Sequence, residues 1–580
     1  MKQLVLILFF LCTICTELSA QKNITSLSPT INIKGVVKED IREIKAGTPF
    51  TLQRFVKLTQ YQPSDPNYRQ AVLIVNGQQQ GVGLNDMYKL EFTPTDPNTF
   101  WLAAQINSRL VQYYETKGLQ ETMRKEMENE ANTYLDELEK AGMIYEDAAM
   151  EDYVHCIMLS MIPKEFIAER YGMPYIRILK SPNPDILMLS NNCMLVSSGL
   201  LTLLDTEDEL FGMLARETAH YVLDHAVITV NKNINRANRA AFWSGVADVA
   251  GLAIEAALYN KYENYVPGAI FTTNAIVQTL VNYDIYNRMG LDYSKQQEKE
   301  ADDVAVQFMQ FMKKDPSALI SAQNKILQYY LEIKDKSVLE KYGIYSSLEE
   351  RLTRLQKKYP LKETGKDPIY LKRTSGLISF SAAMMEYNRD YIQAMKLAQK
   401  NINNKMASSD DYVVMAKCIM KQDNSAESNL KSWEMLKKAE SLSEFSNVNI
   451  SKQKILLLLR DNKQKDAVAE VNQYIQMLND IKQTPHSETD ELWLAKEYHW
   501  TTTLMKQLYI LINSLKIKGI TTRRKFISII TKKISACFPP NMLIFFIFRT
   551  NIFQKKRKSF QRALREKIIC PLLLYTNSIV

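Results

Sequence analysis

The segment at residues 214–220 holds the side chains with the clearest chemical potential. It reads L-A-R-E-T-A-H and carries Arg216, Glu217 and His220. On a helix, the pattern H-E-x-x-H places two histidines one turn apart on the same face to hold zinc, while the glutamate acts as general base toward the metal-bound water. Glu217 and His220 occupy their positions in that pattern, and Arg216 occupies the position of the first histidine. The segment therefore predicts a metallopeptidase-type helix with one metal ligand replaced.

A second group of acidic residues lies further along the chain, in the segment E-K-E-A-D that begins at Glu298 and ends at Asp302. In the pattern E-x-x-x-D the glutamate can supply a third zinc ligand from a neighbouring helix, and the aspartate, one turn later, can orient a ligand histidine. Charged helix faces often show this spacing by chance. Its combination with R-E-T-A-H makes it informative.

Together these segments resemble the family of zinc metallopeptidases that includes HtpX, the CaaX prenyl endopeptidase and BepA. The resemblance covers about residues 100–360. V-S-S-G-L-L at residues 196–201 resembles the family's strand leading into the active-site helix, and S-K-Q-Q-E-K-E-A-D at residues 294–302 resembles its S-R-x-x-E-x-E-A-D segment. The overall plan of signal peptide, peptidase domain and tetratricopeptide-like repeats is also similar to part of this family.

The resemblance implies a role for each residue that matches the family pattern. Glu217 corresponds to the general base, His220 and Glu298 to zinc ligands, and Asp302 to the residue that orients a ligand histidine. Zinc is the implied cofactor, and proteolysis by a metalloendopeptidase is the implied activity. Arg216 stands at the missing ligand position, so both zinc binding and activity are expected to be impaired in this chain.

Two further departures fall on the family's catalytic parts. The segment S-H-P-x-x-E-E-R appears as I-Y-S-S-L-E-E-R, with Tyr345 at the histidine, and an apolar-Gly-Gly turn appears as S-N-N at residues 190–192. His225 follows His220 by five residues, which is ~140° around a continuous helix. We therefore expect His225 to face away from any metal bound by His220 and to have a polar role at the helix end.

The elements that must position these residues predict an α+β fold that is mainly helical. β-forming segments at residues 51–58, 71–75 and 88–92, with an Asn76-Gly77 hairpin signal, predict a small β domain over residues 30–98. The metallopeptidase-like domain is predicted over residues 100–360. It should have a long helix at residues 112–139, short strands at residues 175–179, 186–189 and 193–196, and a helix that begins near Thr206.

Residues 375–515 predict helices joined by polar turns. The turns beginning at Asn388, Gln422 and Asp461 are 34 and 39 residues apart. This spacing resembles tetratricopeptide repeats. A plain helical bundle is the alternative, and the sequence does not separate the two.

The first twenty residues are typical of a secretory signal. Lys2 precedes an apolar run, and small residues end the segment at Ala20. An N-terminal membrane anchor is the alternative, but the run is shorter than the ~20 residues that a span requires. We expect an exported protein that is periplasmic or membrane-associated.

The net charge of +9 is concentrated in one segment. Residues 516–580 hold fifteen Lys or Arg and one acid, which gives +14 and leaves −5 for the other residues. The body therefore offers no basic surface that would indicate nucleic-acid binding. We interpret the tail as an unstructured or read-through end, with contact to a membrane surface as the alternative.

Three functions are compatible with the sequence. The first is a degenerate metalloendopeptidase-family protein that is retained for protein binding or envelope protein quality control. The second is an active zinc metalloendopeptidase with a non-standard ligand set. The third is a helical-repeat scaffold with a vestigial peptidase domain. In each case the expected partners are proteins or peptides, including outer-membrane or envelope proteins.

The break in composition at Lys516 gives a testable prediction. A chain that ends after Leu515 should be expressed and should melt at the temperature of the full chain, because the tail is expected to lie outside the folded body. Thermal unfolding followed by circular dichroism compares the two. Loss of the helical signal on truncation would show that the tail is structural.

Overall fold

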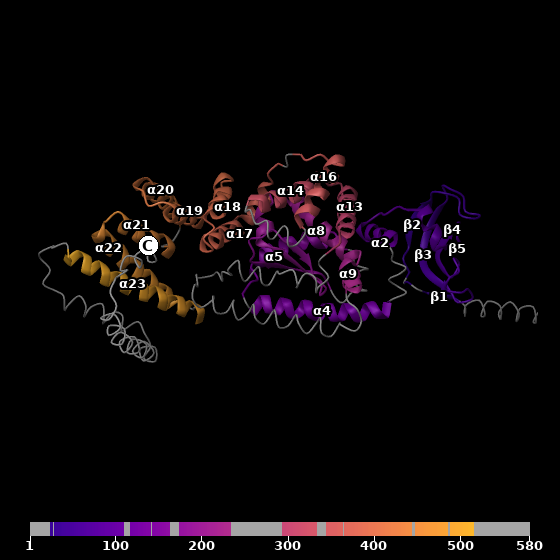
Figure 1. Ribbon diagram of the computed structural model, residues 1–580, viewed down its shortest axis with the longest axis horizontal. Coiled ribbons are helices and arrows are strands. Elements are labelled where there is room, and N and C mark those ends of the chain that lie inside the picture. The colour runs from indigo at the N-terminus through magenta and orange to yellow at the C-terminus, as the bar shows by residue number, and fades with distance from the viewer. Residues whose placement is uncertain are drawn as a thin grey trace, which may run out of the picture. The chain divides into compact units, whose positions relative to one another are not determined.

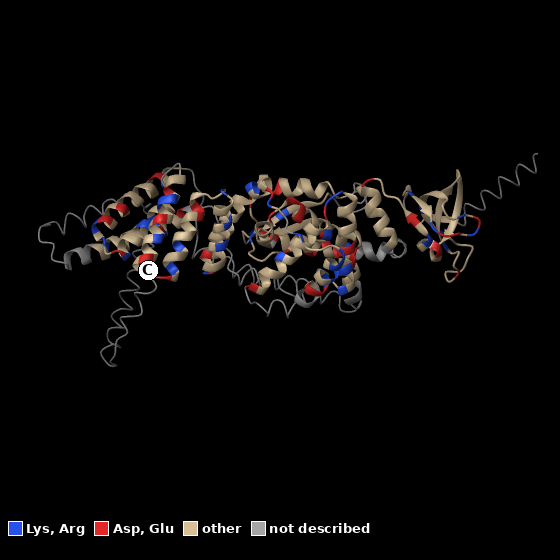
Figure 2. Ribbon diagram, turned by 90° about the horizontal axis from the view of Figure 1, so that it is seen from above, with Lys and Arg blue, Asp and Glu red and all other residues tan. Residues whose placement is uncertain are grey.

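The computed structural model describes the following residues: 24–26, 28, 30–108, 117–140, 142–162, 173–233, 293–332, 344–362, 365–443, 447–484 and 488–514. The predicted signal at residues 1–20 and the basic tail at residues 516–580 lie outside this part. The chain forms two compact units, Met1–Asp423 and Asn424–Val580. The α+β, mainly helical class is confirmed. No described helix is both long and apolar enough to cross a membrane. In Figure 2, positions occupied by Lys or Arg and by Asp or Glu alternate along the ribbon of the described helices.

The first unit begins with an antiparallel β-sheet (Figure 1). Its strands are β1 (Ile24–Ser26), β2 (Ile33–Val37), β3 (Pro49–Leu58), β4 (Arg69–Val75), β5 (Gln78–Gly83) and β6 (Leu90–Phe92). The order is β5-β4-β3-β2-β6, with β1 also paired to β3. The expected hairpin joins β4 to β5, where Asn76 and Gly77 have φ of 52° and 78° as a two-residue type I′ turn requires. Ala103 and Ile106 of α2 (Pro97–Ser108) complete its core.

A second, three-stranded sheet leads into the candidate site. Its strands are β7 (Tyr175–Leu179), β8 (Ile186–Met188) and β9 (Cys193–Ser197), in the order β7-β9-β8. β7 is parallel and β8 antiparallel to β9. The helices around it are α4 (Lys117–Lys140), α5 (Ala148–Leu159), α7 (Ser198–Leu203), α8 (Glu207–Val222), α9 (His225–Asn233), α13 (Lys295–Phe311), α14 (Ser317–Glu332) and α16 (Ile344–Lys358).

The S-N-N turn between β8 and β9 keeps a glycine-like backbone. Asn192 has φ of 65°, a left-handed conformation that asparagine tolerates better than most residues. Its side-chain oxygen accepts a 2.8 Å hydrogen bond from the Tyr221 hydroxyl on α8. The substitution of glycine by asparagine therefore preserves the turn and ties it to the candidate-site helix.

Helix α8 lies at the centre of this unit. Thr206 caps it by accepting a 3.2 Å hydrogen bond from the Glu209 amide, and acidic side chains occupy its first turn, where the helix dipole favours them. A β-carbon added to Gly212 would lie 2.9 Å from Leu319 Cβ, so glycine allows α14 to approach α8 closely. The predicted start of the helix near Thr206 is confirmed.

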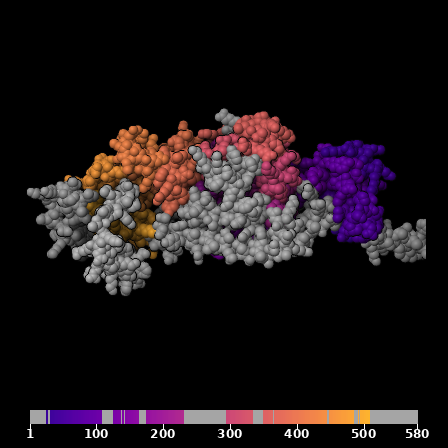
Figure 3. Space-filling model, viewed as in Figure 1, coloured from indigo at the N-terminus to yellow at the C-terminus, as the bar shows by residue number. Residues whose placement is uncertain are grey.

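Helices α17 (Pro368–Tyr387), α18 (Tyr391–Asn403) and α19 (Ser409–Gln422) belong to the first unit. Tyr370 and Leu377 of α17 are buried in the same core cluster as α8. Lys400 of α18 donates 2.8 Å hydrogen bonds to the carbonyl oxygens of Thr202 and Leu204 at the end of α7. Lys396 of α18 also pairs with Glu332 of α14. In Figure 3 the orange surface of the helices after residue 365 adjoins the red surface of the residues before it.

The second unit consists, in its described part, of α20 (Ala426–Leu442), α21 (Val448–Arg460), α22 (Gln464–Gln483) and α23 (Glu488–Ser514), each packed on the next. Ala439 and Ala467 are fully buried, as close helix packing requires. The division between the units lies inside the region 375–515 predicted as repeats, and the choice between repeats and a bundle remains a prediction.

The division between Asp423 and Asn424 predicts which fragment folds alone. A fragment of residues 424–514 should unfold cooperatively by circular dichroism. A fragment that starts at Arg373 should be less soluble, because it cuts α17 and exposes an apolar face that packs on the front domain. Equal solubility and a higher melting temperature for the longer fragment would contradict this.

Candidate functional site

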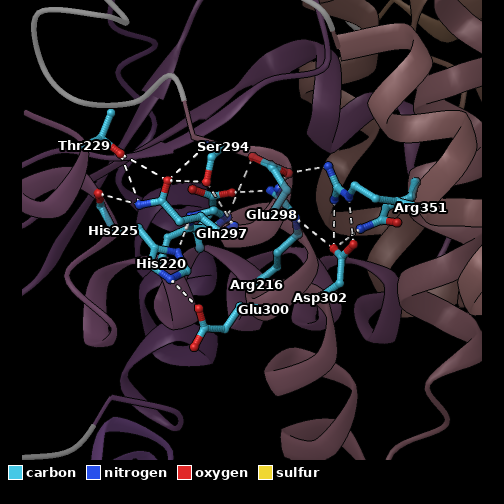
Figure 4. Close-up of polar contacts among 12 residues, drawn as sticks. Arg216, His220, His225, Thr229, Ser294, Gln297, Glu298, Glu300, Asp302 and Arg351 are labelled. Atoms are coloured by element: carbon cyan, nitrogen blue, oxygen red, sulfur yellow. Dashed lines mark hydrogen bonds and ion pairs between the residues drawn. The ribbon is translucent and has the colours of Figure 1, made fainter. Parts of the chain in front are cut away.

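Helices α8 and α13 bring the predicted site residues together (Figure 4). Arg216 and His220 are one turn apart on α8, and Glu298 and Asp302 are one turn apart on α13. Residues at this spacing share a helix face, and the two faces meet where the helices pack. The site is deeply buried, since Asp302 has no exposed surface and His220 is 1% exposed.

Arg216 contacts three carboxylates. Its Nε donates to Asp302 Oδ1 at 3.1 Å and its Nη1 donates to Glu217 Oε1 at 2.7 Å. Its Nη2 donates to Glu298 Oε2. The arginine at the position of the first histidine therefore binds both acids of the second segment and the glutamate beside it.

Arg351 of α16 binds the same acids and was not singled out from the sequence. It donates to both oxygens of Asp302, from Nε at 2.7 Å and from Nη2 at 2.8 Å. Its Nη1 also donates to Glu298. Gln323 of α14 adds a 2.9 Å hydrogen bond to Asp302. Arg351 is the last residue of the segment I-Y-S-S-L-E-E-R. Because this segment matches a family segment, the match could have indicated Arg351 as a site residue.

The electrostatics follow from this geometry. Although burial alone would raise the pKa of Asp302, the charges of Arg351 and Arg216 hold that pKa below its usual range. Burial alone would lower the pKa of Arg216, but the nearby carboxylates raise it above the ordinary value. Burial raises the pKa of Glu217 to about 7, against the opposing charge of Arg216. Asp302 and Arg216 are therefore both charged at neutral pH.

Glu217 is held by groups other than a metal-bound water. One oxygen accepts from Arg216, and the carboxylate also accepts a backbone hydrogen bond from Met188 of β8. The Glu217 carboxylate is therefore bound by the Arg216 guanidinium on one side and by the backbone of the edge strand β8 on the other. The role of Glu217 as general base remains a prediction.

His220 is enclosed by aromatic and imidazole rings. The Tyr293 ring stacks on its imidazole at a centroid distance of 3.8 Å, with 22° between the planes. Burial, and secondly the charge of Arg216, hold the pKa of His220 well below its usual value, so the ring is neutral. Its Nε2 atom lies 3.9 Å from Glu298 Oε1 and has no hydrogen-bond partner among the described residues.

The continuous helix assumed from His220 to His225 is wrong, while the expectation that His225 does not face a metal bound by His220 remains a prediction. Helix α8 ends at Val222, and Asp224 adopts φ of 58° before α9 begins at His225. This break between the helices changes the direction of the chain and brings the His225 side chain back to His220. His225 Nδ1 lies 3.0 Å from His220 Nδ1. The angular argument failed because it assumed one uninterrupted helix.

Tyr345 lies in the first turn of α16, and its side chain is outside the described part of the structure. The structure therefore gives only the backbone position of this departure from the family pattern. The next turn of the same helix contributes Arg351 to the site.

The residues present do not fit a catalytic zinc ion. Such sites use three protein ligands, and His220 and Glu298 supply two. The third position holds Arg216, whose guanidinium has no free lone pair and stays protonated. Within the described ranges, no group of three or more His, Cys, Asp or Glu is arranged to hold a metal ion.

Comparison with models of protein families gives a match for the central part of the chain. Residues 148–365 match the model described as peptidase family M48. No match was found among curated proteins. The matched region runs from α5 through α16 and so includes α8, α13 and every site residue described above.

The contacts of Arg216 predict a large effect on stability. Arg216→Ala should lower the free energy of unfolding by about 3–5 kcal/mol, because it removes the charged partner of the buried Glu217 and one of the two guanidinium partners of Glu298 and Asp302. Arg177→Ala is the matched control. Arg177 pairs with Glu139 and Glu151 at 3.5 and 3.3 Å nearer the surface, so its loss should cost about 1 kcal/mol or less. Urea unfolding measures both, and equal losses would contradict a buried role for Arg216.

Proposed function

We propose, for a chain whose residues 148–365 belong to the zinc metallopeptidase family M48, that the peptidase domain is degenerate and is retained to bind proteins. Arg216 takes the place of a zinc ligand, and proteolysis is lost. The bound partners are proteins or peptides of the cell envelope, and the role is protein quality control or assembly there.

The observation that carries this proposal is the set of three carboxylates on one guanidinium. Arg216 donates to Glu217, Glu298 and Asp302. These are the residues that the family pattern assigns to the general base, a zinc ligand and the ligand-orienting aspartate. All three assigned functions compete with a salt bridge to Arg216.

Charge balance supports the same conclusion. Arg216 adds a positive charge at the position of the first histidine, and together with Arg351, which matches the family pattern, it binds Glu298 and Asp302. A fixed guanidinium repels a dication strongly in a buried, weakly screened site. The acids therefore have their counter-charge without metal, and binding zinc would require Arg216 to leave its three partners.

The envelope location rests on the N-terminal sequence, and the binding role rests on the helical region. Lys2 and the apolar run after it have the order of a secretory signal. The helices α20–α23 form a unit separate from the peptidase domain and are available to hold a partner. The basic tail at residues 516–580 would add contact with an anionic membrane surface if it is part of the mature protein.

One observation favours the second candidate, an active zinc endopeptidase with a non-standard ligand set. His220 Nε2 and Glu298 Oε1 are 3.9 Å apart. Zinc bonds to histidine and carboxylate are about 2.0–2.2 Å long, so one ion could bridge these atoms. This candidate needs a third ligand in place of Arg216.

Metal content tests the proposal. The purified wild-type protein should contain no stoichiometric zinc and should show no casein cleavage that a chelator abolishes. Arg216→His should gain zinc, because it completes H-E-x-x-H with Glu217 and His220. Arg216→Lys is the matched control. It replaces the forked guanidinium by an ammonium group, keeps the positive charge and should not gain zinc.

One tightly bound zinc per wild-type chain, lost on substitution of His220 or Glu298, would overturn the proposal and favour the active peptidase. The gain in Arg216→His is measured by elemental analysis. It does not depend on restored cleavage, because Tyr345 and the altered turn also depart from the family pattern.

A further inference from the structure

We infer that helices α17 and α18 form a clamp that holds the joint between α7 and α8, and that Lys400 and Tyr370 are its positioning residues. The joint consists of residues 201–205 and leads directly into the helix that carries Arg216. Both clamp helices lie after the region that matches the peptidase family. The inference goes beyond the proposed function and does not depend on whether the site binds zinc.

The backbone carbonyl groups of all five joint residues accept hydrogen bonds from the clamp. The Tyr370 hydroxyl of α17 donates to the Leu201 carbonyl oxygen at 2.7 Å. Lys400 Nζ of α18 donates to the carbonyl oxygens of residues 202–204 at 2.8, 3.3 and 2.8 Å. The Asp367 amide, at the start of α17, donates to the Asp205 carbonyl oxygen at 3.1 Å. Because the last carbonyl groups of a helix have no partner within it, the clamp supplies the C-terminal cap of α7.

Lys400 also connects the joint to the first turn of α8. Its Nζ pairs with Asp205 Oδ1 at 2.7 Å, and Lys325 of α14 pairs with Oδ2 of the same carboxylate at 2.6 Å. Lys325 binds Glu209 as well, which lies on α8 and has no exposed surface. The Asp205 amide donates to the Glu209 carboxylate at 2.7 Å. A network of charged groups therefore runs from α18 through the joint to α8.

Buried polar contacts hold the clamp helices together. Asn401, next to Lys400, is 1% exposed and donates to the Ser375 carbonyl oxygen of α17 at 2.9 Å. The same amide group donates to Ser379 of α17 and to the buried carboxylate of Asp411 on α19. Lys400 and the residues of α17 are therefore fixed relative to one another, and the clamp acts on the joint as one body.

Helix α8 transmits a displacement of the joint to the site. It is continuous from Glu207 to Val222, which is about 24 Å at 1.5 Å per residue. A rigid helix can carry energetic coupling over such a length. Arg216 binds its partners at 3.1 and 2.7 Å, and hydrogen bonds of this kind span only about 2.7–3.2 Å. Loss of the clamp should therefore weaken the contacts of Arg216, although Lys400 touches none of them.

The alternative is that the clamp stabilises the joint and nothing else. Lys400 and Arg216 share no ion-pair partner among the described residues. Substitutions at separated positions without a shared partner usually have additive effects on stability. A double-mutant cycle between Lys400 and Arg216 therefore distinguishes coupling through α8 from local stabilisation.

Urea unfolding of the full chain measures this cycle, with a chelator present so that metal has no part in the result. Arg216→Ala should raise the equilibrium constant for unfolding at least about fivefold less in a Lys400→Met background than in the wild-type background, the lower end of typical couplings between sites. Lys396→Met is the matched control, because Lys396 lies on the same helix and pairs with the exposed Glu332. In that background the effect of Arg216→Ala should change by no more than about twofold. Additive effects of Lys400→Met and Arg216→Ala overturn the inference.

Hydrogen exchange followed by mass spectrometry locates the effect in single variants. In Lys400→Met, the amides of residues 213–222 should exchange faster together with those of the joint, while those of β3 should keep their wild-type rates. Faster exchange that is confined to the joint, or that is equal throughout the chain, overturns the inference. Tyr370→Phe removes one hydroxyl group and keeps the buried ring. It should give the same pattern with a smaller amplitude, and it tests the inference even if Lys400→Met does not fold.

Discussion

A guanidinium buried between two helices is the interaction on which the candidate site depends. Arg216 is 9% exposed and contacts carboxylates from its own helix and from α13. A buried charge without partners costs far more than a surface one, and removing either side leaves the other uncompensated. The packing of α8 on α13 is therefore coupled to the presence of all four charged groups.

The same constraint extends to α16. Arg351 completes the neutralisation of Glu298 and Asp302, and the flanking Arg354 pairs with Asp303. Next to Arg351, the same helix buries three leucines in the main core: Leu348, Leu352 and Leu355. Apolar packing fixes the position of α16 and the arginines fix its register against α13. The charged side chains of the site are consequently paired with one another.

A second polar network holds the opposite end of α8. Glu209 has no exposed surface and accepts from Ser321 at 2.7 Å and from Lys325 at 2.8 Å. Asp205 pairs with Lys325 and with Lys400 of α18. Because Lys400 also binds carbonyl oxygens at the end of α7, the first helices after the peptidase domain are part of the frame that positions α8. The site residues at one end of α8 are thus supported by contacts at its other end.

The sequence by itself determined what local patterns can specify. The spacing of Arg216 and His220, the cap at Thr206 and the strands before it follow from helical and strand periodicity, which acts over a few residues. Even the salt bridge from Arg216 to the acids of α13 could be predicted, because a known pairing of segments brought them together and their charges were opposite. Tertiary structure alone decided the positions of Arg351, Tyr293 and His225. Arg351 reaches the site from a third helix, α16, and Tyr293 stacks on His220 from the residue before the cap of α13. His225 turns toward His220 because one residue, Asp224, adopts a left-handed backbone. The division of the helical region after Asp423 was also decided by tertiary structure, since it depends on which helices pack together and not on the turns between neighbouring helices.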